Sequence, residues 1–157
     1  MPTITTFLTF ANQAEEAALF YTSIFEGSRI VKTMRYGKGA PAPEGSVLSV
    51  TFELLGRTYI ALNGGPSFSF SQGFSMFVAC DSQDEVDLYW EKLTAGGKEV
   101  QCGWLTDKFG LSWQVVPSGF EALLSDPDRA KAGRAMQAMM SMKKLHLPTL
   151  QRAFDGE

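Results

Sequence analysis

The chain has 157 residues, of which 45% are hydrophobic and 20% charged, and its net charge is −3 at pH 7. These values are typical of a folded globular protein and exclude disorder of the whole chain, so we expect a single domain over residues 1–157. Because no apolar run approaches about 20 residues and no basic face is concentrated, they also argue against a membrane partner and a nucleic-acid partner.

The first part of the chain predicts a strand, a helix and three more strands. Residues 4–10 form a β-branched and aromatic run that is typical of a strand. A helix is expected next, with Asn12 as its N-cap and Glu15 three residues later, and it ends at Gly27. The three strands that follow are expected at 28–36, 46–55 and 57–63. We call residues 1–66 module one.

The second part, module two (74–117), begins again with a strand, expected at 74–80. Asp81 or Ser82 caps a helix whose inner face carries apolar residues at helical spacing, namely Val86, Tyr89, Trp90 and Leu93. Gly96 and Gly97 end this helix. Further strands are expected at 99–106 and 111–116, so module two shows one clear strand fewer than module one.

The remaining residues, 118–157, are expected to form a C-terminal helical tail, with helices over 119–124 and 126–142. Asp126-Pro127-Asp128 is a typical start for the second of them. The methionines of that helix form an adaptable apolar surface, which either packs on the chain's own sheet or contacts a second copy: Met136, Met139, Met140 and Met142. His146 falls where a helix is expected to stop, a position that the helix macrodipole favours.

The repeated order of elements indicates a duplication. Leu19-Phe20-Tyr21 corresponds to Leu88-Tyr89-Trp90, and Gly27 then corresponds to Gly96. In a second register, Gly56-Arg57-Thr58-Tyr59-Ile60 corresponds to Gly110-Leu111-Ser112-Trp113-Gln114. The expected fold class is therefore α+β, with two βαβββ modules that form curled mixed sheets and with C-terminal helices.

Side chains for the commonest kinds of catalysis are few. His146 is the single histidine, so a histidine base or a histidine-containing metal site would have to use it. Cys80 and Cys102 match no zinc-binding spacing, and neither has a neighbouring histidine or basic residue that would activate a thiol. Residues 1–6 contain no basic region and no cleavage signal, and free thiols are typical of the cytoplasm. We therefore expect a cytoplasmic location.

Several stretches of this chain are similar to a known family: Phe20-Tyr21-Thr22, Ala61-Leu62-Asn63-Gly64-Gly65-Pro66, the block from Cys102-Gly103-Trp104 to Trp113-Gln114-Val115-Val116-Pro117, and Met142-Lys143-Lys144. They resemble the PhnB-like group, labelled 3-demethylubiquinone-9 3-methyltransferase domains. This group belongs to the glyoxalase-like, or vicinal oxygen chelate, superfamily, which includes glyoxalase I, extradiol dioxygenases and bleomycin-resistance proteins. The resemblance covers nearly the whole chain.

The resemblance also implies where a metal would bind. In the metal-using relatives, His and Glu or Gln from the first and last strands of the modules hold a divalent ion that polarises substrate oxygens. Those positions fall on Thr6, Ile60, Ser75 and Gln114 in this chain. None of them is His, Cys, Asp or Glu, and neutral oxygens hold a transition metal poorly. We therefore expect no metal and no other cofactor.

The expected function is the binding of a small molecule, or catalysis without a metal, in the cleft of this family. An apolar pocket with a few polar groups is the common form of a ligand site. The candidate pocket residues are Thr6, Tyr36, Asn63, Ser75, Trp104, Trp113 and Gln114. The two tryptophans would stack on an aromatic ligand, and the two amides would fix its polar edge. Asp107 is interpreted as a turn residue.

Three alternatives remain open at the level of sequence. The first is a metal-dependent lyase or dioxygenase with atypical ligands, and the second is a 3-demethylubiquinone methyltransferase. The latter lacks support, because Gly37-Lys38-Gly39 and Asn63-Gly64-Gly65-Pro66 do not lead into a helix as a nucleotide-binding loop would. The third is a partner-binding module that acts through the methionine-containing helix.

We also expect a homodimer, because each curled half-barrel leaves apolar strand surface that an isolated copy would expose. Two surfaces are candidates for the contact. One is the helix over 126–142, and the other is the segment Phe68-Ser69-Phe70-Ser71-Gln72, which is a natural crossing point if modules are exchanged between chains.

Overall fold

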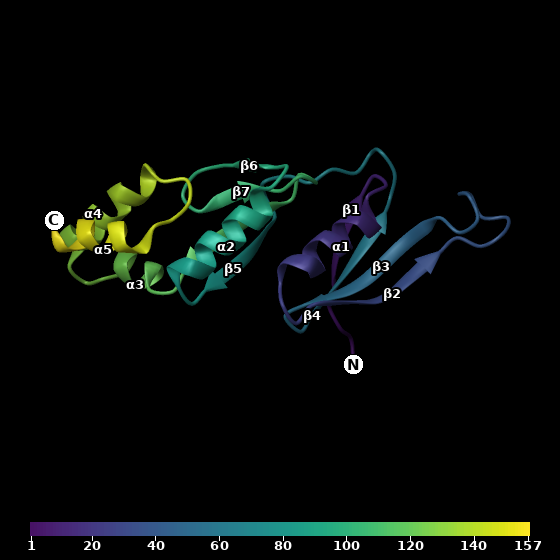
Figure 1. Cartoon of the computed structure of the whole chain (residues 1–157), viewed down its shortest axis with the longest axis horizontal. Helices are drawn as coiled ribbons and strands as arrows, with labels where there is room; N and C mark the ends of the chain where they lie inside the picture. Colours follow the sequence, from purple (N-terminus) through teal and green to yellow (C-terminus); the bar gives the residue numbers. More distant parts are fainter. The chain divides into compact units, whose positions relative to one another are not determined.

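The order strand, helix, three strands occurs twice in the computed structural model, which describes all residues, 1–157 (Figure 1). The chain divides into two compact units, residues 1–69 and residues 70–157. Each unit contains one four-stranded mixed sheet. The predicted α+β class and the duplication of βαβββ modules are therefore confirmed.

Module one has the strand order β1-β4-β3-β2, in which β1 and β4 are parallel and the other neighbours antiparallel. Its core lies between α1 and one face of the sheet, where Leu8, Val50 and Phe52 are buried. The small residues Ala14, Ala17 and Ala18 on the buried side of α1 allow this close packing. The elements are β1 (Thr6–Phe10), α1 (Ala14–Ile24), β2 (Arg29–Arg35), β3 (Val47–Leu54) and β4 (Arg57–Asn63).

The β3–β4 hairpin turns within two residues, close to the single residue, Gly56, that separates the strands predicted over 46–55 and 57–63. Leu55 and Gly56 have positive φ angles of 50° and 83°. Two successive residues with positive φ are what a two-residue hairpin turn needs to match the twist of its strands. Glycine adopts this conformation without a steric penalty, so Gly56 specifies the turn locally.

The start of α1 corrects the prediction that Asn12 is its N-cap. The N-cap residue is Gln13, and its side chain makes no capping hydrogen bond. The amide of Ala14 donates instead to Oδ1 of Asn63, at the end of β4, over 2.9 Å. A side chain that is distant in sequence thus satisfies one of the free amides of the first helical turn.

Module two has the strand order β5-β8-β7-β6, with β5 and β8 parallel. The hydroxyl of Ser82 accepts a hydrogen bond from the amide of Glu85 at the start of α2, so Ser82 is the cap. Of the predicted inner-face residues of this helix, Val86, Trp90 and Leu93 are buried and Tyr89 is half-buried. The elements are β5 (Ser75–Cys80), α2 (Gln83–Thr94), β6 (Lys98–Glu99), β7 (Trp104–Thr106) and β8 (Ser112–Pro117).

The single strand predicted over 99–106 is wrong, because this stretch contains a turn between β6 and β7. Cys102 and Gly103 in the turn have positive φ angles of 58° and 85°, which a continuous strand does not allow. Since β6 is only two residues long, it leaves no recognisable pattern of alternation. It is nevertheless the strand that completes the second βαβββ unit.

The C-terminal helical tail consists of α3 (Phe120–Leu124), α4 (Arg129–Met140) and α5 (Leu147–Asp155). These helices share a core of their own around Leu123, Ala135 and Leu150. No helix of the chain combines the length and the apolar character that crossing a membrane requires.

The prediction that His146 lies at the end of a helix is wrong. His146 is the N-cap of α5, and its Nδ1 atom accepts a hydrogen bond from the amide of Thr149 over 3.3 Å. Pro148 in the first turn fits a helix start, where the missing amide proton is not needed.

The methionines of the tail do not form one surface, in contrast to the prediction. Met139 and Met142 pack against the core of the tail. Met136 and Met140 lie outside it and are 40% and 66% exposed. The prediction treated α4 as a helix with one apolar stripe, whereas its buried side is formed mainly by Ala132 and Ala135.

Candidate functional site

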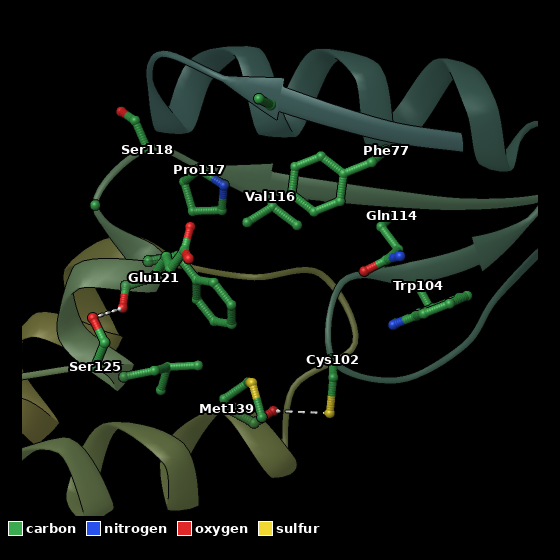
Figure 2. A pocket seen from close by; sticks show the side chains of 14 residues that line it. Phe77, Cys102, Trp104, Gln114, Val116, Pro117, Ser118, Glu121, Ser125 and Met139 are labelled. Carbon is green, nitrogen blue, oxygen red and sulfur yellow. Dashed lines mark hydrogen bonds between the residues drawn. The ribbon is translucent and has the colours of Figure 1, made fainter. Parts of the chain in front are cut away.

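A cavity of about 720 Å³ lies on one face of the module-two sheet (Figure 2). Side chains alternate between the two faces of a strand. The buried residues Cys80, Trp113 and Val115 point to the side of the sheet that α2 covers. The alternate residues of β5 and β8, together with one residue of β7, point to the other side. They form the floor of the cavity: Phe77, Ala79, Trp104, Gln114 and Val116.

The walls opposite this floor come from the C-terminal tail. Gly119, with a φ of 90°, redirects the chain from β8 into α3. Helix α3 then contributes Phe120, Glu121 and Leu124, and the last turn of α4 contributes Met139. Figure 2 shows Glu121 and Met139 facing the strands across the hollow. The cavity is therefore built entirely within residues 70–157.

Gln114 is the polar residue on the floor of the cavity. Its Nε2 atom donates a hydrogen bond to the hydroxyl of Ser75 over 3.0 Å. This bond orients the carboxamide and leaves the Oε1 atom as an acceptor on the cavity side (Figure 2). Trp104 lies directly across the ladder from Gln114, because the two residues are register partners of β7 and β8.

The tail is attached to α2 through a network of polar contacts. Nε2 of Gln83 donates to the carbonyl of Leu145 over 2.9 Å, and its Oε1 accepts from the amide of Leu147 over 2.8 Å. Lys144 forms an ion pair of 2.7 Å with Asp87. The hydrogen bond from Lys144 is the main cause that lowers the pKa of Asp87. These contacts hold the segment between α4 and α5 in place.

The β6–β7 turn forms a second attachment for the tail. The amides of Cys102 and Gly103 donate to the carbonyls of Met142 and Lys143, each over 2.8 Å. A Cβ atom at Gly103 would lie 2.9 Å from a methyl carbon of Leu145, so only glycine lets the two segments approach this closely. The turn thereby ties the open edge of the cavity floor to the segment after α4.

The two cysteines are free thiols in different surroundings. Burial, and to a smaller extent the carboxylates of Glu85 and Asp81, raises the pKa of Cys80 to about 11. Cys102 lines the cavity, and its thiol donates to the carbonyl of Met139 over 3.7 Å.

Trp113, a predicted pocket residue, belongs to the core of module two. It is 2% exposed, and its indole nitrogen donates to Oδ2 of Asp107 over 2.8 Å. Oδ1 of Asp107 accepts from the amides of Phe109 and Leu111, over 2.8 Å and 3.1 Å. Asp107 thus forms the predicted turn, and it also orients the Trp113 side chain on the side away from the cavity.

Tyr36 and Asn63 line a different hollow, of about 520 Å³, in module one, together with Glu15 and Glu16. Both polar side-chain atoms of Asn63 form hydrogen bonds within module one. Oδ1 accepts from Ala14, and Nδ2 donates to the carbonyl of Val47 over 3.0 Å.

Thr6 lines a third hollow, of about 340 Å³, beside Tyr59. It is the register partner of Tyr59 and alternates in phase with the buried residues Leu8 and Phe10. Thr6 is therefore on the α1 side of its sheet. Of the seven predicted pocket residues, the structure brings together Ser75, Trp104 and Gln114 in the module-two cavity region.

The positions that hold metal ligands in the metal-using relatives do not suit a metal here. Phe7 pairs with Ile60 in module one, and Phe77 pairs with Gln114 in module two. Phe7 therefore corresponds to Phe77, which is one residue away from the predicted match of Thr6 with Ser75. These positions offer two phenylalanines, an isoleucine and a carboxamide, and Ser75 adds a hydroxyl. Neutral oxygen donors of this kind bind transition metals weakly. No group of three or more His, Cys, Asp or Glu residues is placed to hold an ion.

Several cavity residues were missed by the sequence analysis, above all Phe77, Phe120 and Glu121. Phe77 is 59% exposed although it lies in the middle of a strand, and such an exposed aromatic residue is a usable signal once the faces of the strand are known. No local pattern indicates that α3 faces the sheet across the cavity, because this depends on the packing of α3 against α4 and α5.

The paired βαβββ modules give the chain a glyoxalase-like fold. Among solved structures, protein PA1353 from Pseudomonas aeruginosa is 20% identical and covers 74% of this chain and 98% of its own, with a TM-score of 0.61. The fosfomycin resistance protein FosX from Listeria monocytogenes, solved with Mn(II) and 1S,2S-dihydroxypropylphosphonic acid, is 17% identical. It covers 76% of this chain and 94% of its own, with a TM-score of 0.56. At these identities the likeness shows the fold alone.

The family model described as 3-demethylubiquinone-9 3-methyltransferase matches residues 2–116. The PhnB protein from Bacillus cereus is 36% identical and covers 74% of this chain and 100% of its own, with a TM-score of 0.69. The chain therefore belongs to the PhnB-like 3-demethylubiquinone-9 3-methyltransferase family. No curated protein matches the chain. Helices α3 and α4, which supply the wall of the cavity opposite the sheet, begin after the residues that the family model matches.

Proposed function

We propose that module two binds a small aromatic molecule in the cavity between its sheet and the C-terminal tail, either as a binding protein or as an enzyme that acts without a metal. The observation that carries this proposal is the cavity itself. Its volume of about 720 Å³ lies within the range of small-molecule sites, about 300–1,000 Å³. Its walls are mostly apolar, and a few polar groups stand among them.

Aromatic side chains on two sides of the cavity favour a planar ligand. Phe77 and Trp104 come from the strands, and Phe120 comes from α3. Offset or edge-to-face contacts between rings stabilise a complex by about 0.5–1.5 kcal/mol each beyond the burial of area. A bound ring would also cover Phe77, which is 59% exposed without one.

The anchored carboxamide of Gln114 supplies the directional contact. Ser75 already holds its Nε2 atom, so the Oε1 atom is oriented before a ligand arrives. Such preorganisation reduces the side-chain entropy that binding would otherwise cost. A hydroxyl or amine hydrogen on the ligand is the matching donor.

The proposal does not extend to the methyl transfer named in the family description. The glycine-containing loop 37–45 joins two strands, and the residues after β4 lead into turns before β5. Neither segment opens a helix, as the loops that bind dinucleotides do. A metal-dependent lyase or dioxygenase is also not favoured, since the chain's own donors at the family's ligand positions are neutral.

Filling the cavity tests the proposal. Ala79 lies on the cavity floor, whereas Ala122 is exposed on α3 and does not line the cavity. We expect wild type and Ala122→Trp to bind 1-naphthylmethanol in equilibrium dialysis and Ala79→Trp to lose that binding, with all three folded by circular dichroism. Equal binding by Ala79→Trp, or no binding by wild type at millimolar ligand, would contradict the proposal.

We further propose that the chain acts as a homodimer. Large apolar side chains remain exposed on a single copy, among them Phe68 at 50% and Met140 at 66%. Sedimentation at micromolar concentration is expected to show twice the chain mass, and a single species of 17.2 kDa would contradict this. Loss of the dimer in Phe68→Asp but not in Met140→Asp would place the contact at the segment 68–72, and the reverse would place it on α4.

A further inference from the structure

We infer that the module-two cavity selects aromatic organic cations, such as arylalkyl amines, and that Glu121 is the residue that determines this preference. The inference rests on the proposed function and names the class of ligand for the same cavity. It comes from the charged side chain and the aromatic rings among the residues that line the cavity.

Glu121 is the one formally charged side chain among the residues that line the cavity. No lysine, arginine or histidine is among them. The Glu121 carboxylate forms no ion pair with the rest of the chain. Figure 2 shows it on the α3 wall, across from the strands. A cationic ligand would therefore find a free counterion, whereas an anion would find only a like charge.

The end of α4 lies at another wall of the cavity. Met139 lines the cavity from the last turn of this 12-residue helix, where the carbonyl ends of the peptide dipoles accumulate. The first turn of α3 carries the opposite partial charge, but Glu121 lies in that turn and offsets it. The carbonyl of Met139 already accepts from the amides of Ser141 and Met142 and from the thiol of Cys102, so neither helix end outweighs the charge of Glu121 itself.

The aromatic rings of Phe77, Trp104 and Phe120, which line the cavity, also favour a cation. An aromatic face attracts a cation through its quadrupole, by about 0.5–1 kcal/mol at exposed sites and more where water is excluded, with tryptophan the strongest. The indole N–H of Trp104 and the carboxamide of Gln114 are neutral and can bind ligands of either sign. They cannot replace the counterion that a desolvated anion needs.

Three ligands of one shape and different charge test the inference. These are 1-naphthylmethylamine, which is cationic at pH 7, 1-naphthylmethanol, which is neutral, and 1-naphthylacetate, which is anionic. In equilibrium dialysis at low salt, we expect wild type to bind the amine about tenfold more tightly than the acetate. This preference should shrink in 0.5 M NaCl, because salt screens a carboxylate near the surface.

Variants at Glu121 locate the origin of the preference. Glu121→Gln is expected to weaken binding of the amine about threefold to fivefold, as expected for one partly exposed ion pair, and to leave the alcohol unchanged. Glu121→Lys should reverse the order of the amine and the acetate. Glu91→Gln is the matched control, since Glu91 is exposed on α2 outside the cavity and its loss changes the net charge equally.

The outcomes separate this inference from the proposed function. Equal binding of all three ligands, or an amine affinity that Glu121→Gln and Glu91→Gln change equally, overturns the inference and leaves the cavity as a neutral aromatic site. Failure of wild type to bind the alcohol and the amine, or binding that Ala79→Trp does not reduce, overturns the proposed function and the inference with it.

Discussion

Oδ1 of Asn63 accepts a hydrogen bond from the amide of Ala14, although the two residues are 49 positions apart in the sequence. The same side chain donates to the carbonyl of Val47 through Nδ2. One residue at the end of β4 thus satisfies the start of α1 and a carbonyl of β3. The role expected of Asn63 was to fix the polar edge of a ligand, and the structure shows both of its polar atoms in use within the fold.

Replacement of Asn63 by alanine is therefore expected to destabilise module one. It removes the acceptor of the Ala14 amide and leaves the Val47 carbonyl without its donor, at a cost of about 1–2 kcal/mol in the free energy of unfolding. Urea denaturation of Asn63→Ala measures this cost. Asn12→Ala is the control and should change the free energy by less than about 0.5 kcal/mol, because Asn12 does not cap the helix. Equal costs for the two variants would contradict this role.

Asp107 is expected to be equally important in module two. Its carboxylate accepts three hydrogen bonds, from two backbone amides and from the indole of Trp113. In Asp107→Asn, the new NH₂ group must face one of these donors, so at least one buried bond is lost and stability should fall by about 1–3 kcal/mol. A red shift of Trp fluorescence should accompany the loss.

Asp126→Asn is the matched control for this prediction. Oδ1 of Asp126 accepts a single hydrogen bond, from the amide of Asp128 over 2.8 Å, and an asparagine keeps that acceptor. We expect its free energy of unfolding to stay within about 0.5 kcal/mol of wild type. A similar loss in both variants would show that Asp107 acts through its charge alone.

The parts of the fold that were predictable from sequence are those with local causes. The positive φ at Gly56 and the hydroxyl of Ser82 at the start of α2 specify their turn and cap within a few residues. The two-residue strand β6 is too short to show a period, and the start of α1 depends on Asn63. Neither of these can be seen in a local window of sequence.

The candidate site was predicted only in part for a related reason. Ser75, Trp104 and Gln114 were expected together as residues of the family cleft, and they lie on one face of the module-two sheet. A register shift of one residue moves a side chain to the opposite face of its sheet, and this explains why Thr6 lies on the α1 side. Glu121 and Phe120 reach the cavity only through tertiary packing of the tail.

Gln83 is expected to stabilise the attachment of the C-terminal tail to α2. Gln83→Ala removes the side-chain bonds to Leu145 and Leu147, so the start of α5 should open more often. We predict faster hydrogen exchange of the Leu147 amide by about tenfold, as expected for a local loss of about 1.4 kcal/mol. Gln151→Ala is the control, since Gln151 donates only to Asp155 within α5. Unchanged exchange at Leu147 in Gln83→Ala would contradict the prediction.

Divalent metals are expected to leave the melting temperature unchanged. Specific binding to the native state raises stability by RT ln(1 + [L]/Kd), so an ion at 1 mM with a micromolar Kd would add about 4 kcal/mol. The donors at the positions discussed above are a carboxamide and a hydroxyl, which do not provide such affinity. Melting curves of tag-free protein with Mn²⁺ or Zn²⁺ and with EDTA should coincide. A saturable rise that Gln114→Ala abolishes would show a metal site at the cavity floor.

The buried thiol of Cys80 is expected to lower the free energy of unfolding at alkaline pH. Burial raises its pKa from the ordinary value of 9.0 to about 11, so the unfolded state releases this proton before the folded state does. The contribution of this pKa difference to the free energy of unfolding is fully present below about pH 9. It decreases as the pH rises through 11, by at most about 3 kcal/mol. Cys80→Ala removes this contribution at the cost of a constant packing loss. The difference between wild type and Cys80→Ala, measured by urea unfolding from pH 7 to pH 11, should therefore narrow above pH 9.

Lysine and tyrosine side chains also titrate in this range, but they are present in both proteins and cancel in the difference. Cys102→Ala serves as the second comparison, because Cys102 lines the cavity and is less buried than Cys80. Its curve should keep the alkaline slope of wild type.

Iodoacetamide gives an independent measurement, since the reactive species is the thiolate. At pH 8, peptide mapping should show Cys80 unmodified in the native protein and alkylated after unfolding. Parallel stability curves together with rapid native alkylation of Cys80 would show that burial does not suppress its ionisation.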